Sequence, residues 1–519
     1  MEAHRSTIRS YLPKILSLKN HKLLLTLGLF LFLIIHNFAF FQSTHFFAGD
    51  DAGVHLTSVR SLIEGTDNST YFYPSEEMPL RQQLFHLTAA AFSKMISPEN
   101  FIEISRVISI LAFSLASLFL YLSIRRFTDE IPAILGAVIF NLSSAYQALL
   151  WGGQLSQIFG IFILNLFIYL TLRFSHRSLL LRSFIILIGL LILYKTHELA
   201  FSIGAALGIT YLLIELFHYS KKLFLATCGV GITPFVFVLF SELANHLPSY
   251  IGGSLTEHSA GIYGYFTTSE GIPQLLLFLF TFGIIALIVR RHWRFLAIFA
   301  LVFTIVNAGI LEMAVYPGRY MVYFFEIFAV ISMFGLYEVF QGIAWMLKRY
   351  YSKGFFIIHI LFFVVVFSIL VPLAQFELVL AERYQVYNYF PPLIPKEDVI
   401  AIEWLDANLA DDVLIAAPMK WGIYIPPISG RAVVLYPYIG VIGDFINEMG
   451  LLFKAESAAE AYEQAQKLGV THVFIPSAVE NFTFTTYYDD LGYRFDSFED
   501  NYYFNVVYAK DYAYILEVR

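Results

Sequence analysis

The stretch Leu23 to Phe41, LLLTLGLFLFLIIHNFAFF, is soon followed by Gly49-Asp50-Asp51-Ala52-Gly53-Val54-His55. The first stretch is about as long as a bilayer-spanning helix requires, and no small-residue cleavage site follows it, so we expect a retained membrane helix and not a signal peptide. The second stretch places two carboxylates and a histidine beside the lipid boundary, where charge is costly. Together they predict a membrane protein with a functional site at the membrane surface, acting on something that the membrane delivers.

The composition is that of an integral membrane protein. Of the 519 residues, 58% are hydrophobic and 14% are charged, whereas soluble domains carry about 25% charged residues. The mean hydropathy is +0.66. The formal net charge is -7, with basic residues in short loops and acidic residues concentrated near the C-terminus. Without a basic face, the sequence predicts no nucleic-acid partner. The single cysteine, Cys228, excludes an intrachain disulfide and a thiolate zinc site.

Apolar windows predict a polytopic α-helical membrane protein with about 11 transmembrane helices. The stretch 183–195 is short for a span, which predicts a broken or re-entrant helix there. The expected spans are 23–41, 104–124, 131–150, 157–173, 183–195, 199–217, 222–243, 273–289, 294–311, 319–341 and 354–376.

The distribution of Lys and Arg predicts the orientation. With the basic tail before Leu23 in the cytoplasm, loops such as Arg125-Arg126, Lys221-Lys222 and Arg290 to Arg294 also face the cytoplasm, as the positive-inside rule requires. The N-terminus is then cytoplasmic and the C-terminal region extracytoplasmic. Four polar clusters fall on the outer side: Asp50-Asp51-His55, Trp151-Gly152-Gly153-Gln154, Lys195-Thr196-His197-Glu198 and Tyr316-Pro317-Gly318-Arg319-Tyr320.

Two regions lie outside the membrane in this arrangement. The first outer loop, about 42–103, contains helical spacing over Leu56 to Ile63 and Leu84 to Met95, which predicts amphipathic helices on the membrane surface. After Phe376 the composition changes to that of a small α/β domain. We expect a helix at 399–408, a strand at 412–417, a helix at 458–467, a strand at 471–475 and a closing hairpin from 502–508 and 512–518. The predicted domains are 1–380, transmembrane with the first outer loop, and 381–519, extracytoplasmic.

Asp50 and Asp51 are the predicted catalytic residues. One of them is suited to remove a proton from an acceptor hydroxyl. Alternatively the pair, with His55, binds a divalent cation such as Mg or Mn that steadies a phosphate leaving group. Capping of the following helix explains one aspartate, but it does not explain two aspartates and a histidine.

Other outer residues are predicted to bind substrate. Lys195, His197 and Glu198 interrupt an apolar stretch, either as an internal Lys–Glu pair or as a site wall in which His197 or Glu198 contacts a metal or a sugar. Asp51, His197 and Glu198 form the candidate metal set. Arg319, followed by Tyr320, lies at the outer start of a helix and is suited to clamp a phosphate; snorkelling is the alternative. Gln154 hydrogen-bonds either a sugar or another helix.

Several short motifs resemble one known family. Phe47 to Gly65 contains Asp50-Asp51 and then His55; Tyr73-Pro74 leads to Leu84-Phe85-His86-Leu87; and the C-terminal region contains Leu-Gly-Val-Thr-His-Val-Phe at 468–474. These features are similar to those of the GT-C fold glycosyltransferases, which include protein mannosyltransferases, aminoarabinose transferases and oligosaccharyltransferase catalytic subunits. The resemblance implies that Asp50 or Asp51 is the catalytic base or a metal ligand, and that Arg319 contacts the lipid phosphate.

The predicted function is that of a glycosyltransferase on the outer face of the membrane. It moves a sugar from a polyprenyl-phosphate-linked donor to a hydroxyl of a lipid, glycan or protein acceptor. The Trp-Trp-Asp signature of oligosaccharyltransferases is absent from the C-terminal region, which favours transfer of single sugars. The alternatives are a transporter or flippase of lipid-linked saccharides, which predicts essential polar groups at mid-membrane, and a non-catalytic membrane scaffold.

Overall fold

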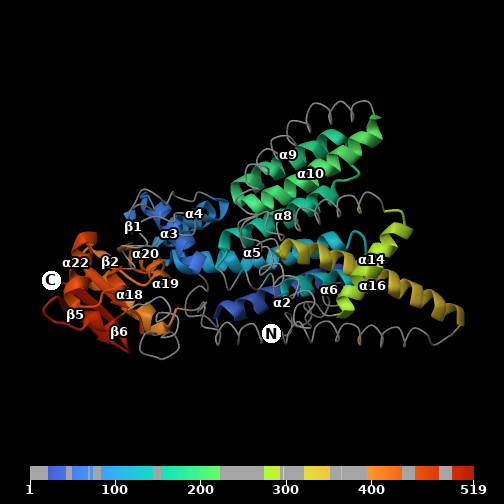
Figure 1. Cartoon of the computed structure of the whole chain (residues 1–519). Helices are drawn as coiled ribbons and strands as arrows, with labels where there is room; N and C mark the ends of the chain where they lie inside the picture. The colour runs from blue at the N-terminus through green and yellow to red at the C-terminus, as the bar shows by residue number, and fades with distance from the viewer. Residues whose placement is uncertain are drawn as a thin grey trace, which may run out of the picture. The chain divides into compact units, whose positions relative to one another are not determined.

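The computed structural model describes most of the helical bundle and of the C-terminal region (Figure 1). The described residues are 21–42, 50–67, 70–73, 83–143, 146, 149, 153–221, 274–292, 296, 321–350, 364, 394–434, 451–477 and 494–519. Within them the chain forms two compact units. The first is 1–38, 111–148 and 157–380; the second is 39–110, 149–156 and 381–519.

The first unit is built of apolar helices. Their bounds, together with those of α5 and α8, whose first residues belong to the second unit, are α2 His21–Gln42, α5 Phe101–Ile124, α6 Glu130–Asn141, α8 Leu155–Arg173, α9 Leu179–Thr196, α10 Glu198–Tyr219, α14 Gln274–Val289 and α16 Met321–Tyr350. Buried polar pairs tie neighbouring helices together: the Asn37 amide donates to Ser114 Oγ at 2.9 Å and the Asn141 amide to Ser117 Oγ at 3.2 Å. Such pairs satisfy side chains that would otherwise face hydrocarbon.

Five stretches of the described residues are long and apolar enough to cross a membrane by length and composition: Pro98–Ile124, Leu155–Arg173, Leu179–Thr196, Glu198–Phe217 and Phe325–Ile343. The predicted span 222–243 lies outside the described part of the chain, and so do 294–311 and 354–376 apart from the single residues Leu296 and Val364. The predicted count of about 11 therefore stays a prediction.

Two span predictions differ from the structure. The stretch 183–195 is the greater part of the unbroken helix α9, which begins earlier because the Ser178 side chain accepts a hydrogen bond from the Leu181 N–H at 3.4 Å. The helix α6 ends at Asn141, well before the predicted residue 150. At its end the Ser143 hydroxyl donates to the Phe140 carbonyl oxygen at 2.8 Å, which competes with continued helix.

The second unit contains a six-stranded sheet packed against short helices. Its elements are α3 Asp50–Glu64, β1 Phe72–Tyr73, α4 Leu84–Ile96, α18 Lys396–Asn408, β2 Leu414–Ala416, α19 Met419–Gly422, α20 Ile425–Ser429, β3 Ala432–Val434, α22 Ala458–Leu468, β4 His472–Ile475, β5 Phe504–Lys510 and β6 Ala513–Val518; short 3-10 turns span Pro98–Asn100 and Asp496–Phe498. The strand order is β1-β3-β2-β4-β6-β5. The first three pairings are parallel, whereas β4–β6 and β6–β5 are antiparallel.

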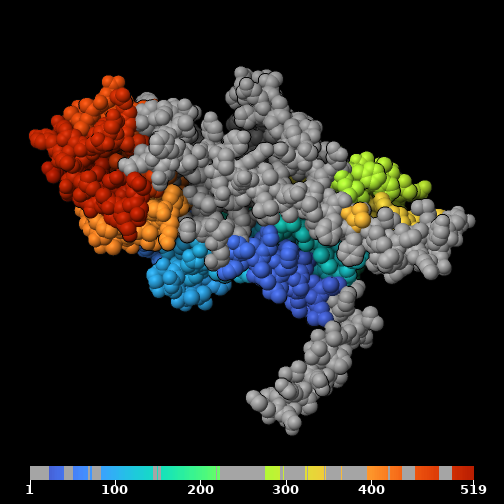
Figure 2. Space-filling model, turned by 90° about the horizontal axis from the view of Figure 1, so that it is seen from below, coloured from blue at the N-terminus to red at the C-terminus, as the bar shows by residue number. Residues whose placement is uncertain are grey.

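The predicted C-terminal elements are confirmed. The helix α22 starts at an N-cap, since the Ser457 hydroxyl accepts from the Glu460 N–H at 3.3 Å, and it ends at Gly469 in the left-handed region (φ 69°). The β5–β6 hairpin turns through Asp511 and Tyr512, both with positive φ, as a two-residue turn of this twist requires. Figure 2 shows the residues from 394 onward, coloured orange to red, as one dense lobe.

The first outer loop is part of this second unit. Phe72 pairs with Val433 and Tyr73 with Val434, so β1 extends the sheet of the C-terminal region. The predicted ranges 1–380 and 381–519 grouped this loop with the membrane domain. In the structure residues 39–110 cluster with 381–519 instead, because backbone pairing and the packing of α3 join them.

Candidate active site

The helix α3 carries the acidic motif of the first outer loop. It begins at Asp50, whose side chain lies outside the described part of the structure, and every residue from Asp51 to Val59 is buried. The predicted helix is therefore confirmed, and its place on the membrane surface stays a prediction, but the amphipathic pattern does not give it an exposed face between Asp51 and Val59. The reason is that α4 packs on one side of α3 and α20 on another.

Two close contacts bring the backbone of α20 and its neighbours onto α3. A Cβ atom at Gly53 would lie 2.5 Å from the carbonyl oxygen of Ile423, so only glycine fits there. Further along, the Arg60 guanidinium donates to the carbonyl oxygens of Pro426 and Pro427, at 3.5 Å each. Gly430, in the left-handed region (φ 69°), leaves room for that guanidinium. The position of the motif is thus fixed by residues from the far end of the chain.

Asp51 is a buried carboxylate with a defined partner. It is 4% exposed, and its Oδ2 accepts a hydrogen bond from the Gln154 side-chain amide. Gln154 reaches it because Gly153 takes a left-handed conformation (φ 68°) just before α8, and the Gln154 N–H is fixed to the Leu149 carbonyl oxygen at 2.9 Å. A buried carboxylate with one oxygen held by an amide is oriented, as a general base must be.

Beside Asp51 on α3, His55 belongs to a chain of hydrogen bonds. His86 Nδ1 accepts from the Gln83 backbone N–H at 3.3 Å, so the His86 proton is on Nε2. His86 Nε2 lies 2.8 Å from His55 Nδ1, which therefore accepts, and His55 Nε2–H faces Ser156 Oγ at 3.4 Å. Both imidazoles are consequently neutral in this arrangement. Both are also buried, at 1% and 0% exposure.

His86 and Ser156 are the participants that sequence reasoning did not assign to the site. His86 was noted only as part of a motif. One signal could have found it: Phe85, His86, Ala89, Ala90 and Ser93 form the buried face of α4, and a histidine on such a face requires a polar partner. The predicted helix is confirmed as α4, and its other side exposes the apolar side chains Phe92, Met95 and Ile96; its placement on the membrane surface stays a prediction.

The cluster at Lys195 to Glu198 forms the turn between α9 and α10, in the first unit. His197 is 4% exposed and caps α10, its Nδ1 accepting from the Leu199 N–H at 3.3 Å. Its Cβ lies so close to Gly160 that a methyl group there would be 2.8 Å away. Lys195 and Glu198 are exposed, and Lys195 Nζ lies 5.7 Å from the ring centroid of Tyr194. No salt bridge between Lys195 and Glu198 occurs in this described turn. Arg319 and Tyr320 lie outside the described residues.

The described residues do not by themselves fit a divalent cation. Among them no three His, Cys, Asp or Glu side chains gather closely enough to hold one, and Oδ2 of Asp51 is already taken by an amide donor. The set of Asp51, His197 and Glu198 stays a prediction, with Asp51 in the second unit and His197 and Glu198 in the first.

No family model matches the chain, and no curated protein matches it. Solved structures do. The apo structure of the oligosaccharyltransferase of Archaeoglobus fulgidus has a TM-score of 0.59 at 15% identity, over 90% of this chain and 71% of that one. The archaeal oligosaccharyltransferase AglB from the same organism, in complex with an inhibitory peptide and a dolichol-phosphate, has a TM-score of 0.54 at 15% identity, over 88% and 70%.

A second protein gives a similar match over almost its entire length. ArnT from Cupriavidus metallidurans, in the apo state, has a TM-score of 0.52 at 11% identity, over 95% of this chain and 97% of that one. At these identities the likeness concerns the fold. The resemblance inferred from the sequence motifs is confirmed at that level: the chain has the GT-C fold.

Proposed function

We propose that the chain is a glycosyltransferase that moves a sugar from a polyprenyl-phosphate-linked donor to an acceptor hydroxyl at the extracytoplasmic membrane surface. The observation that carries the proposal is the buried carboxylate of Asp51 at the start of α3, which the Gln154 amide orients. It occurs in a chain that has the GT-C fold. A neighbouring structure with this fold contains a dolichol-phosphate, which supports a lipid phosphate as the donor's leaving group.

The proposed reaction is a single displacement. The acceptor oxygen forms a bond to the anomeric carbon while the bond from that carbon to the phosphate oxygen breaks, and the polyprenyl phosphate leaves with the electron pair. Asp51, oriented by the Gln154 amide, takes the proton of the attacking hydroxyl. The predicted partner of the leaving phosphate is Arg319, whose guanidinium matches phosphate geometry.

The His55–His86 pair has a supporting role in this proposal. Its two neutral rings are packed beneath Asp51 on α3 and α4 and join those helices through one hydrogen bond of 2.8 Å. This bond holds α3, and with it Asp51, against α4.

The test is turnover of a polyprenyl-phosphate monosaccharide that carries a radiolabelled sugar, with the full-length protein in lipid nanodiscs. Release of free polyprenyl phosphate reports the reaction whichever acceptor is used. We expect Asp51→Asn to lower kcat by about 10²–10⁴-fold, the range for loss of a general base, while the exposed Asp412→Asn variant keeps wild-type turnover. Asp50→Asn and Arg319→Ala, measured alongside, assign the second acid and the phosphate clamp.

Equal turnover of wild type and Asp51→Asn would remove Asp51 as the base. If the intact donor were carried across the bilayer without cleavage, the result would instead support a transporter function.

A further inference from the structure

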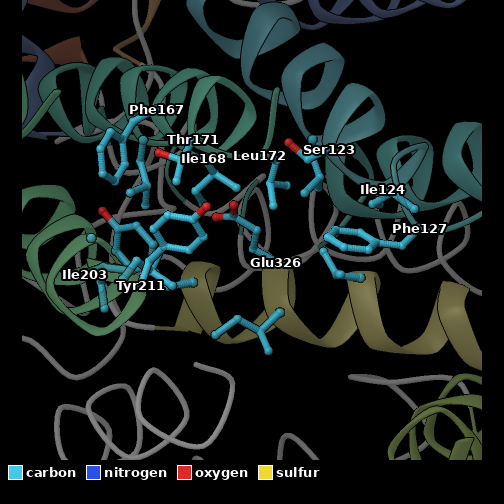
Figure 3. A pocket seen from close by; sticks show the side chains of 17 residues that line it. Ser123, Ile124, Phe127, Phe167, Ile168, Thr171, Leu172, Ile203, Tyr211 and Glu326 are labelled. Atoms are coloured by element: carbon cyan, nitrogen blue, oxygen red, sulfur yellow. The ribbon is translucent and has the colours of Figure 1, made fainter. Parts of the chain in front are cut away.

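A second site lies inside the helical bundle, at the end where the basic loops are. One cavity of about 160 Å3 is enclosed by side chains of α5, α8, α10 and α16. Figure 3 shows these side chains pointing into it, with Phe167 and Leu172 from α8, Ile203 from α10 and Ile124 from α5 among them. Nearly all of its surface is carbon. A cavity of this kind receives an apolar chain.

A second cavity, of about 230 Å3, adjoins the first and is basic. The two share Ile124, Phe127 and Val330 as lining residues, so they lie next to each other on either side of these side chains. The second one is also lined by Arg126, His292 and Thr128. The apolar cavity and the basic one, here called the basic mouth, are together complementary to an amphiphile with an anionic head.

The basic mouth is a built feature of the fold. Arg126 is exposed, and its guanidinium carbon lies 5.9 Å from the ring centroid of Tyr169. No ion pair to Arg126 occurs among the described residues, whereas its neighbour Arg125 pairs with Glu130 at 3.6 Å. The Arg126 charge is therefore available to a ligand.

His292 is held at the mouth by a strained turn. The helix α14 ends at Val289, and Arg291 takes a left-handed conformation (φ 58°), which is unfavourable for a residue with a side chain. This conformation lets the His292 N–H donate to the Leu287 carbonyl oxygen at 2.9 Å and places the imidazole edge-on to Phe334, at 5.9 Å between ring centroids. Strain of this kind persists where the surroundings impose it, and it is common at ligand sites.

One acid lines the apolar cavity. Glu326 is 5% exposed, and it lies one helical turn before Val330 on α16, away from Phe334 and His292. The basic side chains Arg126 and His292 line the adjoining cavity instead, so we expect an anionic head there and its chain in the apolar cavity.

We propose that these two adjoining cavities together bind a lipid phosphate, with the phosphate at Arg126 and His292 and the hydrocarbon chain between α5, α8, α10 and α16. By the positive-inside rule we expect this end of the bundle to face the cytoplasm. The residues that line the two cavities belong to the first unit and Asp51 to the second, so the site shares no residue with the Asp51 site, and the inference does not rest on the proposed glycosyl transfer.

The experiment uses the full-length protein in phosphatidylcholine nanodiscs with dodecyl phosphate that carries a photoreactive diazirine near the chain end. After irradiation, the labelled peptides are identified by mass spectrometry. We expect labels on α8, α10 and α16, and competition by unlabelled dodecyl phosphate but not by dodecanol or inorganic phosphate. Arg126→Gln should weaken the apparent affinity about tenfold, as expected for loss of one charge-assisted contact. Arg177→Gln, an exposed arginine in the turn after α8, is the matched control and should bind as the wild type does.

Several outcomes would overturn the proposal. Equal affinity of Arg126→Gln and wild type would remove the phosphate contact, and competition by dodecanol would reduce the site to an apolar pocket. Stronger competition by dodecylamine than by dodecyl phosphate would mean that Glu326 selects a cationic head. Competition by inorganic phosphate would mean that the site binds phosphate without a hydrocarbon chain. Because Arg126 is on the surface, its variant should fold; Val330→Trp, which enlarges a side chain that lines both cavities, provides a second test by loss of labelling.

Discussion

Replacing Gly53 with alanine should separate the contribution of α3 placement from that of the catalytic groups themselves. The added Cβ would lie 2.5 Å from the Ile423 carbonyl oxygen and 2.9 Å from the carbonyl carbon. Both are backbone atoms, so the neighbour cannot avoid the contact by changing a rotamer. The helix and the segment around Ile423 must therefore move apart by nearly 1 Å, since ordinary contacts between carbon atoms are about 3.5–4.0 Å.

Two terms of opposite sign decide the effect on stability. Overpacking of this kind costs about 1–3 kcal/mol, while alanine in a helix gains about 0.5–1 kcal/mol over glycine. Because the two closest atoms belong to the backbone, the overpacking term is the larger one. We therefore expect the free energy of unfolding to fall by about 1–2 kcal/mol. The displacement also moves Asp51 relative to Gln154, and a misplacement of about 1 Å is enough to lower turnover about 10²-fold.

The assay measures thermal unfolding and donor turnover on the same nanodisc preparation. Gly28→Ala is the control, because no atom lies within 4 Å of the Cβ it adds to α2, so neither quantity should fall. If Gly53→Ala matched Gly28→Ala in both measurements, the contact between α3 and Ile423 would not position the site, and the account of why α3 is buried would fail.

Two further predictions concern buried titratable groups in the second unit. Burial raises the pKa of Asp398 to about 6, although the Trp421 indole N–H and the Ser477 backbone N–H donate to it at 2.5 and 2.7 Å. Because the folded-state pKa lies above the unfolded value, the free energy of unfolding should rise by about 3 kcal/mol as the pH falls from above 6 to below 4. Thermal unfolding at pH 7 and pH 5 should therefore show a wild-type gain that Asp398→Asn lacks, and a pH-independent difference between the two proteins would contradict the assignment. Replacing His86 with phenylalanine leaves His55 Nδ1 and the Gln83 N–H without their bonds to His86, so we expect a loss of about 1–3 kcal/mol together with lower turnover, whereas the exposed His176→Phe should change neither.

The sequence predicted those parts of the structure whose signals are local. The helices α18 and α22, the strands β2 and β4 and the β5–β6 hairpin all follow from periodicity and turn residues over short windows. The helical character of α3 and α4 followed in the same way. These elements would have the same pattern wherever they packed.

The parts that were not predicted depend on contacts between distant segments. The strands β1 and β3 have two and three residues, too few for an alternating pattern, and they pair across more than three hundred residues of sequence. The burial of α3 depends on Gly53 and Ile423, which no window of the sequence contains together. The partner of Gln154 also depends on a distant segment. The sequence allowed either a sugar or another helix as its hydrogen-bond partner, and in the structure its side-chain amide donates to Asp51.

The construction of the second unit explains how an acid that follows the first apolar helix is held in a fixed position. A helix on the membrane surface is free to tilt and slide, because lipid offers no directional contact. Here α3 is held instead by the backbone of the segment 423–430, by Arg60 and by strand β1, all joined to one sheet. These contacts fix Asp51 within the core of the second unit, while the first turn of α8 supplies Ser156 and the preceding turn supplies Gln154. The C-terminal region therefore contributes no acid or base to the described cluster, yet the position of the carboxylate depends on it.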